Sequence, residues 1–576
     1  MRIDSKQKLA GLLVPVFSLR HDKDFGIGDT TAMIDAIDFC AQTNMGILQI
    51  LPINETGGDN SPYSAISSVA LDPLYLTLAP NTVPGLTDQM IAEAAPNPVL
   101  EELRRGPVKY PRVREVKIQL LWSAFNAFEK NDTANDTDLS SQWQKFEQEN
   151  KRWLEPYTLF RTLMDHHNGS SVWTQWEENV QNYGDALKTV KAAPNAKEIE
   201  RSRRFWSYVQ WLGFKQWKNV KHHAETRSVK LMGDLPFAVG RYSADVWSER
   251  KLFDLDWSCG SPPETYFQGD KFVSEWGQNW GMPLYQWKAH KEENYAWWRQ
   301  RVFHLTELFH YFRIDHVLGF FRVYAFPWIP ERNGEFVNLT KEEAKKITLG
   351  KLPHFIPRSD ELPKDAESNA KEGTELLKVL MDAAGDTGIV AEDLGMVPDY
   401  VRPLIHKLGM AGFAIPIFER VEEDRSFKPK ETLAPLSLAT YGTHDHEPIA
   451  TYYNRLVEWW HGADGSEGWK EIQRLMNFLG LDENNPPEKF TDALHMVFLK
   501  VLLETPCWVA VVMITDLLGT TQRFNEPGLS GDENWSQRLD RPLQRYLDDS
   551  AYGPKIREFA RLIKETQRAP LVSARS

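Results

Sequence analysis

Short apolar runs recur along the chain and alternate with amphipathic stretches. A continuous apolar run of about four to eight residues favours a buried strand, whereas apolar residues at helical spacing favour a helix. The helical pattern at 32–43 is followed by the apolar run 46–52, a β-α-β unit typical of a parallel sheet. The pattern predicts strands at 12–19, 46–52, 229–239, 311–317, 388–394, 412–418, 436–443 and 508–515.

Helical patterns separate most of these strands. They lie at 293–310 and 368–384, and a further helix begins near Pro398. The simplest closure of eight strands alternating with helices is a (β/α)8 TIM barrel, an α/β fold, with long inserted subdomains. A doubly wound open sheet is the alternative, but no GxGxxG or GxxxxGK[ST] motif supports nucleotide binding in such a sheet.

The pattern of apolar and polar positions also divides the chain into three parts. Residues 1–84 form the first part of the catalytic barrel, and residues 85–225, rich in charged and Trp-bearing helical stretches, form a mainly helical insertion after the second strand. Residues 226–576 complete the barrel, with irregular loop insertions near 250–292 and helices at the C-terminal end. Within the insertion, the polar stretch 129–140 predicts a loop.

The composition argues against several classes of function. With 67 Lys and Arg against 80 Asp and Glu, the net charge of −13 argues against nucleic acid as a partner. No apolar run approaches the roughly 20 residues that span a membrane, and the apolar stretch 9–19 fits a first strand better than a signal peptide. The three cysteines, Cys40, Cys259 and Cys507, lie far apart, which favours a cytoplasmic location and excludes a cysteine-based zinc site.

Acidic residues stand at the ends of three predicted strands. Asp315 shares one strand face with Arg313, which should keep it ionised; Glu392 and Asp445 follow later strands. In a barrel these ends open into one mouth, so the carboxylates would converge, and at least one should have a raised pKa. An acid and a nucleophilic carboxylate are the pair that cleaves a glycosidic bond. Each acid alone fits a structural salt bridge equally well, but the three together favour catalysis.

Several segments resemble the signature regions of the 4-α-glucanotransferases, the amylomaltase or disproportionating-enzyme family (glycoside hydrolase family 77, α-amylase clan). The resemblance covers nearly the whole chain in the family's order. It rests on Ser-Pro-Tyr-Ser at 61–64, Gly-Asp-Leu-Pro at 233–236, Pro-Pro-Glu-Thr-Tyr-Phe at 262–267, Trp-Gly-Met-Pro at 280–283, Phe-Arg-Ile-Asp-His at 312–316, Ala-Glu-Asp-Leu-Gly at 391–395, Gly-Thr-His-Asp at 442–445 and Arg-Phe-Asn-Glu-Pro-Gly at 523–528. The chain departs from the family's shorter sequence at 323–328.

The resemblance implies a role for each matching residue. Asp315 would be the nucleophile, Glu392 the general acid/base, and Asp445 a third acid that binds sugar hydroxyls. Tyr266 and Phe267 match a loop that folds over the donor glucan, and the remaining sugar-binding positions would be Ser61, Tyr63, Asp234, Trp280, Arg313, His444 and Asn525.

The implied reaction moves a segment of an α-1,4-glucan to the 4-hydroxyl of glucose or another glucan by a retaining double displacement. It needs no cofactor and no metal. The implied partners are maltooligosaccharides and α-1,4-glucans, for a monomer or homodimer.

Three other functions stay open on the residues alone. An α-amylase-like hydrolase would use the same acids with water as acceptor. A metal-dependent barrel hydrolase could use His316, His444 and His446, but the first strand lacks the His-x-His that would complete such a site. A glucan-binding protein without catalysis is the third alternative, and three intact acids argue against it.

Overall fold

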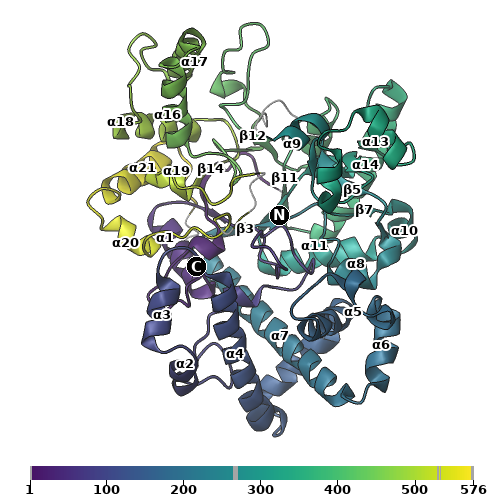
Figure 1. Cartoon of the computed structure of the whole chain (residues 1–576). Coiled ribbons are helices and arrows are strands. Elements are labelled where there is room, and N and C mark those ends of the chain that lie inside the picture. The colour runs from purple at the N-terminus through teal and green to yellow at the C-terminus, as the bar shows by residue number, and fades with distance from the viewer. Residues whose placement is uncertain (1–2, 264–269, 528–530, 532, 572–576) are drawn as a thin grey trace.

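Eight parallel strands form the centre of the computed structural model, which describes residues 3–263, 270–527, 531 and 533–571 (Figure 1). Their order in the sheet is β11-β8-β3-β2-β1-β14-β13-β12. A parallel bridge between Val390 and Ala411 joins the two outer strands, so the sheet closes into a barrel. The strands are β1 (Leu9–Leu13), β2 (Ile47–Gln49), β3 (Lys230–Leu235), β8 (Tyr311–Ile314), β11 (Gly388–Ala391), β12 (Gly412–Ala414), β13 (Ser437–Ala439) and β14 (Val509–Met513).

All eight predicted strands occur, and the prediction of a (β/α)8 barrel is confirmed. Most of the strands are apolar runs because both of their faces are covered; every residue of β1 and β14 is buried. β3 and β8 are interrupted by Asp234 and Arg313. The first strand ends at Leu13, whereas we predicted residues 12–19. Pro15 cannot donate to a neighbouring strand, and Val16–Ser18 forms a 3-10 turn instead.

Helices cover the outside of the barrel. α1 (Thr30–Gln42) begins where the Asp29 carboxylate accepts hydrogen bonds from two N–H groups of its first turn, and it buries Met33 and Ile37. The helices predicted at 293–310, at 368–384 and near Pro398 are α11, α14 and α15. The bounds are α11 (Ala296–Leu308), α14 (Pro363–Ala384), α15 (Val401–Leu408), α16 (Ile449–Trp460), α17 (Gly465–Leu479), α18 (Asp492–Leu503), α19 (Ile514–Leu518), α20 (Leu543–Leu547) and α21 (Gly553–Glu565).

Six helices lie between β2 and β3 and occupy the lower part of Figure 1. Their buried side chains, such as Phe205 and Trp217 of α7, belong to the same continuous core as those of β1 and β2. The predicted loop at 129–140 is wrong in part: Glu129–Thr133 forms one π-helical turn, and the Thr137 hydroxyl caps a helix that begins at Asp138. The helices are α2 (Asp88–Ala94), α3 (Asn97–Arg104), α4 (Tyr110–Phe128), α5 (Asp138–His166), α6 (Tyr183–Ala192) and α7 (Ala196–Thr226).

A second, antiparallel sheet of four strands lies beside the barrel, in the order β10-β9-β5-β6. Much of it falls in 250–292, which we predicted to be irregular. That prediction is wrong because strands of two to four residues are too short to show an alternating pattern. The short elements are α8 (Ala244–Ser248), β4 (Phe253–Asp254), β5 (Ser258–Ser261), α9 (Lys271–Trp276), β6 (Gln278–Asn279), β7 (Leu284–Tyr285), α10 (Trp287–Glu292), β9 (Val323–Phe326), α12 (Asn333–Phe336), α13 (Lys341–Ile347) and β10 (His354–Ile356).

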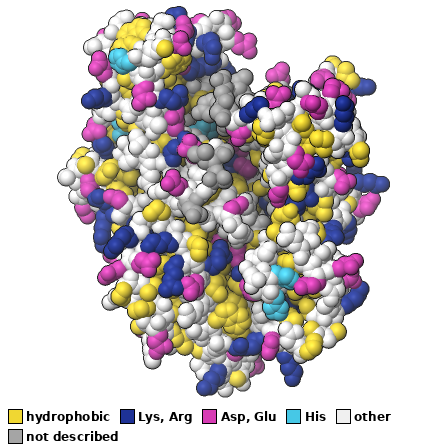
Figure 2. Space-filling model, in the orientation of Figure 1, with side chains coloured by type: hydrophobic (Ala, Val, Ile, Leu, Met, Phe, Trp, Pro, Cys, Tyr) yellow, Lys and Arg dark blue, Asp and Glu magenta, His cyan; other side chains and the backbone are white. Residues whose placement is uncertain are grey.

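A cleft opens on the face shown in Figure 2, between the region of α16 and α17 and the region of α13 and α14. It lies over the carboxyl ends of β8 and β11, where parallel barrels place their functional loops. Among the described residues, no helix combines the length and apolar character that crossing a membrane requires.

Candidate active site

Arg313 stands at the centre of the site. On β8 it pairs in register with Asp234 of β3, and its side chain is only 2% exposed. Nη1 donates to Asp234 Oδ2 at 2.5 Å, and Nη2 donates to Asp315 Oδ1 at 2.6 Å. The same Nη2 lies 3.4 Å from Glu392 Oε1. One guanidinium therefore faces three carboxylates.

Asp315 and Glu392 leave their strands in the same way. The Asp315 N–H donates to the Leu235 carbonyl at 3.0 Å, and the Glu392 N–H donates to the Ile314 carbonyl at 3.0 Å, so each acid directly continues its strand. His316 then adopts the left-handed conformation (φ 49°), and the chain turns. Its N–H donates to Glu392 Oε2 at 2.6 Å, which fixes that carboxylate beside Asp315.

Asp445 belongs to a tight turn after β13. Its Oδ1 accepts a hydrogen bond from Asn525 Nδ2 at 2.6 Å, and its Oδ2 lies 3.3 Å from His444 Nε2. The Arg523 guanidinium donates to the Asp445 carbonyl at 3.0 Å. The segment 523–525, far along the chain, thus orients the third acid.

Aromatic rings form one wall of the site. The Tyr63 ring stacks on the His444 ring with centroids 5.2 Å apart and planes within 16°, while its hydroxyl donates to Asp234 Oδ2 at 2.8 Å. Trp535 packs against both rings. We did not predict Trp535; it follows the motif at 523–528 without belonging to it, and only the folded chain shows that it contacts the site.

A cavity of about 1040 Å³ joins these groups. Predicted site residues that line it are Ser61, Tyr63, Trp280, Asp315, Glu392, His444 and Asp445. Asp234, Arg313 and Asn525 lie next to the lining, in contact with Tyr63, Asp315 and Asp445. Tyr266 and Phe267 lie outside the described residues. His316 and His446, which we considered only as metal ligands, also line the cavity, as do residues that the sequence did not indicate: Phe237, Arg322, Tyr324, Phe355, Met396, Arg402 and Phe418.

Burial sets the electrostatics of the acids. It raises the pKa of Asp315 well above its ordinary value; the Arg313 ion pair opposes this shift, and the Glu392 and Asp234 charges add to it. Burial also raises the pKa of Asp234, although the Arg313 charge and the Tyr63 hydrogen bond act to lower it. The expectation that converging carboxylates include one with a raised pKa is confirmed. We expected Arg313 to keep Asp315 ionised by lowering its pKa. That expectation is wrong, because the effect of burial on the pKa outweighs the ion pair.

Asp445 behaves differently. Burial would raise its pKa, but His444, Arg313 and the Asn525 hydrogen bond together hold the pKa below its ordinary value. Burial also lowers the pKa of His444, so that ring is largely neutral near pH 7 and attracts Asp445 less there. The Asn525 amide is the partner that persists across pH. Asp445 is thus suited to accept hydrogen bonds from hydroxyl groups.

The histidines of the metal hypothesis have other contacts. His446 Nδ1 accepts from the Thr443 N–H at 3.0 Å, and the His316 ring packs edge-on against Trp280 at 4.9 Å. Within the part of the chain that the structure describes, no three or more His, Cys, Asp or Glu side chains group as a metal site. The donor set therefore does not favour that hypothesis.

Comparison with known proteins identifies relatives over most of the chain. The family model described as 4-alpha-glucanotransferase matches residues 14–544. A 4-alpha-glucanotransferase of Chlamydia caviae is 30% identical over 561 residues, which cover 95% of this chain and 94% of the relative.

Two solved structures share the fold. The amylomaltase of Streptococcus agalactiae, in complex with acarbose, aligns with a TM-score of 0.73 at 21% identity, covering 98% of this chain and 100% of that one. The amylomaltase of Corynebacterium glutamicum aligns with a TM-score of 0.76 at 19% identity, covering 98% and 76%. Since the family model spans most of the chain and the strand-end acids meet at one barrel mouth, the chain belongs to the 4-α-glucanotransferase family, glycoside hydrolase family 77.

Proposed function

We propose that the protein transfers a segment of an α-1,4-glucan to the 4-hydroxyl of glucose or another α-1,4-glucan, with retention of configuration. The observation that carries the proposal is the cluster of Asp315, Glu392 and Asp445 at the mouth of a barrel whose sequence belongs to this family. Maltooligosaccharides are the natural substrates of such a site. The reaction uses no cofactor.

Asp315 is the nucleophile and Glu392 the general acid/base. Glu392 protonates the leaving sugar oxygen while Asp315 attacks the anomeric carbon; Glu392 then takes the proton from the acceptor hydroxyl as the glycosyl-enzyme breaks down. Two inversions give retention.

The spacing of the two acids supports this division. One Arg313 nitrogen lies 2.6 Å from Asp315 Oδ1 and 3.4 Å from Glu392 Oε1. Those two oxygens are therefore at most about 6 Å apart. Retaining pairs lie about 5–5.5 Å apart and inverting pairs about 6.5–9.5 Å apart.

The other residues hold the sugar. Asp445, oriented by Asn525, accepts hydrogen bonds from ring hydroxyls, and the Tyr63 ring packs against one sugar face. Ser61, Trp280 and His444 line the same space. Asp234 and Arg313 set the position and charge of Asp315 and Tyr63 from below. Tyr266 and Phe267 stay predictions, as do a cytoplasmic location and a monomeric or homodimeric state.

The product profile from maltotriose tests the proposal. Wild-type protein should form glucose and longer oligosaccharides, with little net gain of reducing ends; steadily increasing reducing ends would mean hydrolysis instead. Asp315→Asn should lower kcat by about four orders of magnitude or more, because it removes the nucleophile. The matched control is Asp399→Asn, the same change at an exposed acid, which should keep wild-type activity. Full activity of Asp315→Asn would refute the proposal.

A further inference from the structure

The four-stranded sheet carries an aromatic row that no family motif covers. In its register, Tyr324 of β9 lies opposite Gly260 of β5 on one side and Phe355 of β10 on the other. The neighbouring positions Val323 and Ala325 point to the opposite face, where they are buried in the core. Gly260, Tyr324 and Phe355 all line the large cavity that also contains Asp315 and Glu392.

The two rings are held rigidly. They meet edge to face, with centroids 5.3 Å apart. The Arg322 guanidinium lies 3.7 Å from the Phe355 ring centroid and pairs with Asp360. Asp360 in turn accepts hydrogen bonds from Tyr400 and Asn369. This network orders the aromatic surface before any ligand arrives, so binding there loses little side-chain entropy.

The two rings are accessible from the cavity. Tyr324 and Phe355 are each partly exposed and line it. Exposed aromatic faces suit a sugar, which offers apolar ring faces.

The row lies on the side of Glu392. His316 donates its N–H to Glu392, and the His316 ring contacts Trp280, whose own N–H donates to the Cys259 carbonyl of β5. A continuous chain of contacts therefore leads from the general acid/base to the sheet. In a retaining transfer the general acid/base stands beside the departing sugar and then beside the acceptor.

We propose that Tyr324 and Phe355 form an acceptor subsite that binds sugar units beyond the one that receives the new bond, so that glucan chains are better acceptors than glucose. This proposal rests on the proposed function. It concerns the segment that begins at 323, where the chain departs from the family's shorter sequence.

The test uses a labelled α-maltosyl fluoride as donor, because its fluoride leaving group needs no acceptor subsite. Transfer to glucose is compared with transfer to maltotetraose. For Tyr324→Ala and Phe355→Ala, the ratio of kcat/KM for maltotetraose to kcat/KM for glucose should fall roughly three- to tenfold. Tyr324→Phe keeps the ring and should retain most of the ratio. Leu349→Ala, at a residue 92% exposed in the same segment, is the control.

The outcomes separate the two proposals. Variants that fold, as judged by wild-type circular dichroism, yet keep the wild-type acceptor ratio would overturn the acceptor subsite alone. Equal losses with both acceptors would also overturn it. A wild-type protein that releases fluoride and maltose but extends neither acceptor would refute the proposed function itself.

Discussion

At the scale of single residues, the site depends on how one buried cation is shared. Arg313 offsets Asp234, Asp315 and Glu392 at once, so at least two of its neighbours would be uncompensated if all three acids were ionised. Burial raises the pKa values of both Asp234 and Asp315, and the charges of Glu392 and Asp234 add to the shift at Asp315. Asp315, the nucleophile that we propose, is therefore more basic than an ordinary aspartate, which suits attack on an anomeric carbon.

Removal of Arg313 should therefore be costly. Arg313→Ala leaves Asp234 and Asp315 without their main partner, and we expect a loss of about 3–5 kcal/mol in the free energy of unfolding. Arg313→Lys keeps the charge but loses the two-pronged geometry, so it should be less destabilising while kcat still falls. Urea unfolding and steady-state kinetics measure both effects. A stable, active Arg313→Ala protein would contradict this description of the site.

The raised pKa of Asp315 also predicts how stability depends on pH. Unfolded Asp has a pKa of about 3.9, and the folded value is higher. Between the two values the folded state binds more protons than the unfolded state, so stability falls as pH rises through this window. Asp315→Asn removes that cost, so its Tm at pH 7 should exceed the wild-type Tm by at least about 2 °C.

The gain should vanish below the ordinary Asp pKa, where Asp315 is protonated in both states. Activity changes in the opposite sense, because the nucleophile must be ionised: the acidic limb of the wild-type rate profile should lie above pH 4 or so. Calorimetry of both proteins across pH checks the first expectation. A Tm gain that persists unchanged at low pH would contradict it.

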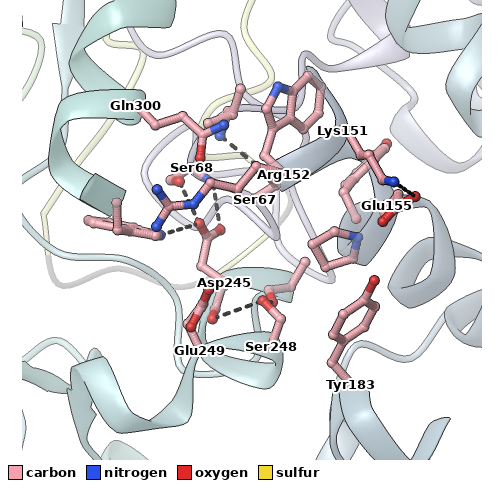
Figure 3. A pocket seen from close by; sticks show the side chains of 16 residues that line it. Ser67, Ser68, Lys151, Arg152, Glu155, Tyr183, Asp245, Ser248, Glu249 and Gln300 are labelled. Atoms are coloured by element: carbon pink, nitrogen blue, oxygen red, sulfur yellow. Dashed lines mark hydrogen bonds and ion pairs between the residues drawn. The ribbon is translucent and has the colours of Figure 1, made fainter. Parts of the chain in front are cut away.

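At the scale of elements, the loop 54–68 carries Ser61 and Tyr63 to the site and is anchored at both ends. At its start, the fully buried Glu55 accepts a hydrogen bond from Arg161 Nε at 2.9 Å and another from Tyr157, both on α5. At its end, the Asp245 carboxylate accepts hydrogen bonds from the Ser68 N–H and hydroxyl and from the Trp297 indole. Figure 3 shows Ser68 and Asp245 side by side. Helix α5, between β2 and β3, thus holds the start of the loop that carries Ser61 and Tyr63, whereas α8 and α11, after β3, hold its end.

Glu55→Gln should weaken that anchor. It leaves Arg161 with one buried partner fewer, and we expect about 3 kcal/mol less stability, together with a raised KM because Tyr63 is held less firmly. Glu149→Gln is the matched control, since Glu149 is an exposed acid of α5 that pairs with Lys145 at the surface. This substitution should change the free energy of unfolding by no more than about 1 kcal/mol. Equal effects of the two substitutions would contradict the anchoring role.

The sequence predicted best those elements whose pattern is contained within one short stretch of the chain. Most barrel strands are apolar runs; Asp315 and Glu392 directly follow two of them, and Asp445 lies in the turn after a third, so the pattern indicated all three acids before the family resemblance implied their roles. The second sheet was missed because β9 pairs with β5 and β10 across long sequence separations, and no local pattern records such pairing. Phe355 of β10 was missed for the same reason, whereas Trp535 was missed because its contacts with Tyr63 and His444 join segments far apart in the sequence. Tyr63 and Asn525 were found only through family resemblance.

At the scale of the whole molecule, the barrel and the helices between β2 and β3 share one core. We propose that residues 85–225 are an insertion that folds as part of the barrel. The protein should then unfold in a single calorimetric transition, and Glu55→Gln should shift that transition as a whole. Two resolved transitions in wild-type protein, with only the first shifted by the substitution, would show that the insertion is an independent unit.

The central claim is that Asp315 forms a covalent glycosyl-enzyme while Glu392 supplies and removes the proton. Glu392→Gln incubated with α-maltosyl fluoride tests it most directly, because fluoride leaves without an acid while the breakdown of the intermediate lacks its base. Mass spectrometry of the digested protein should locate a maltosyl group on the peptide that contains Asp315, and the adduct should be absent from Glu392→Gln/Asp315→Asn. A maltosyl group found on any other residue would contradict the claim.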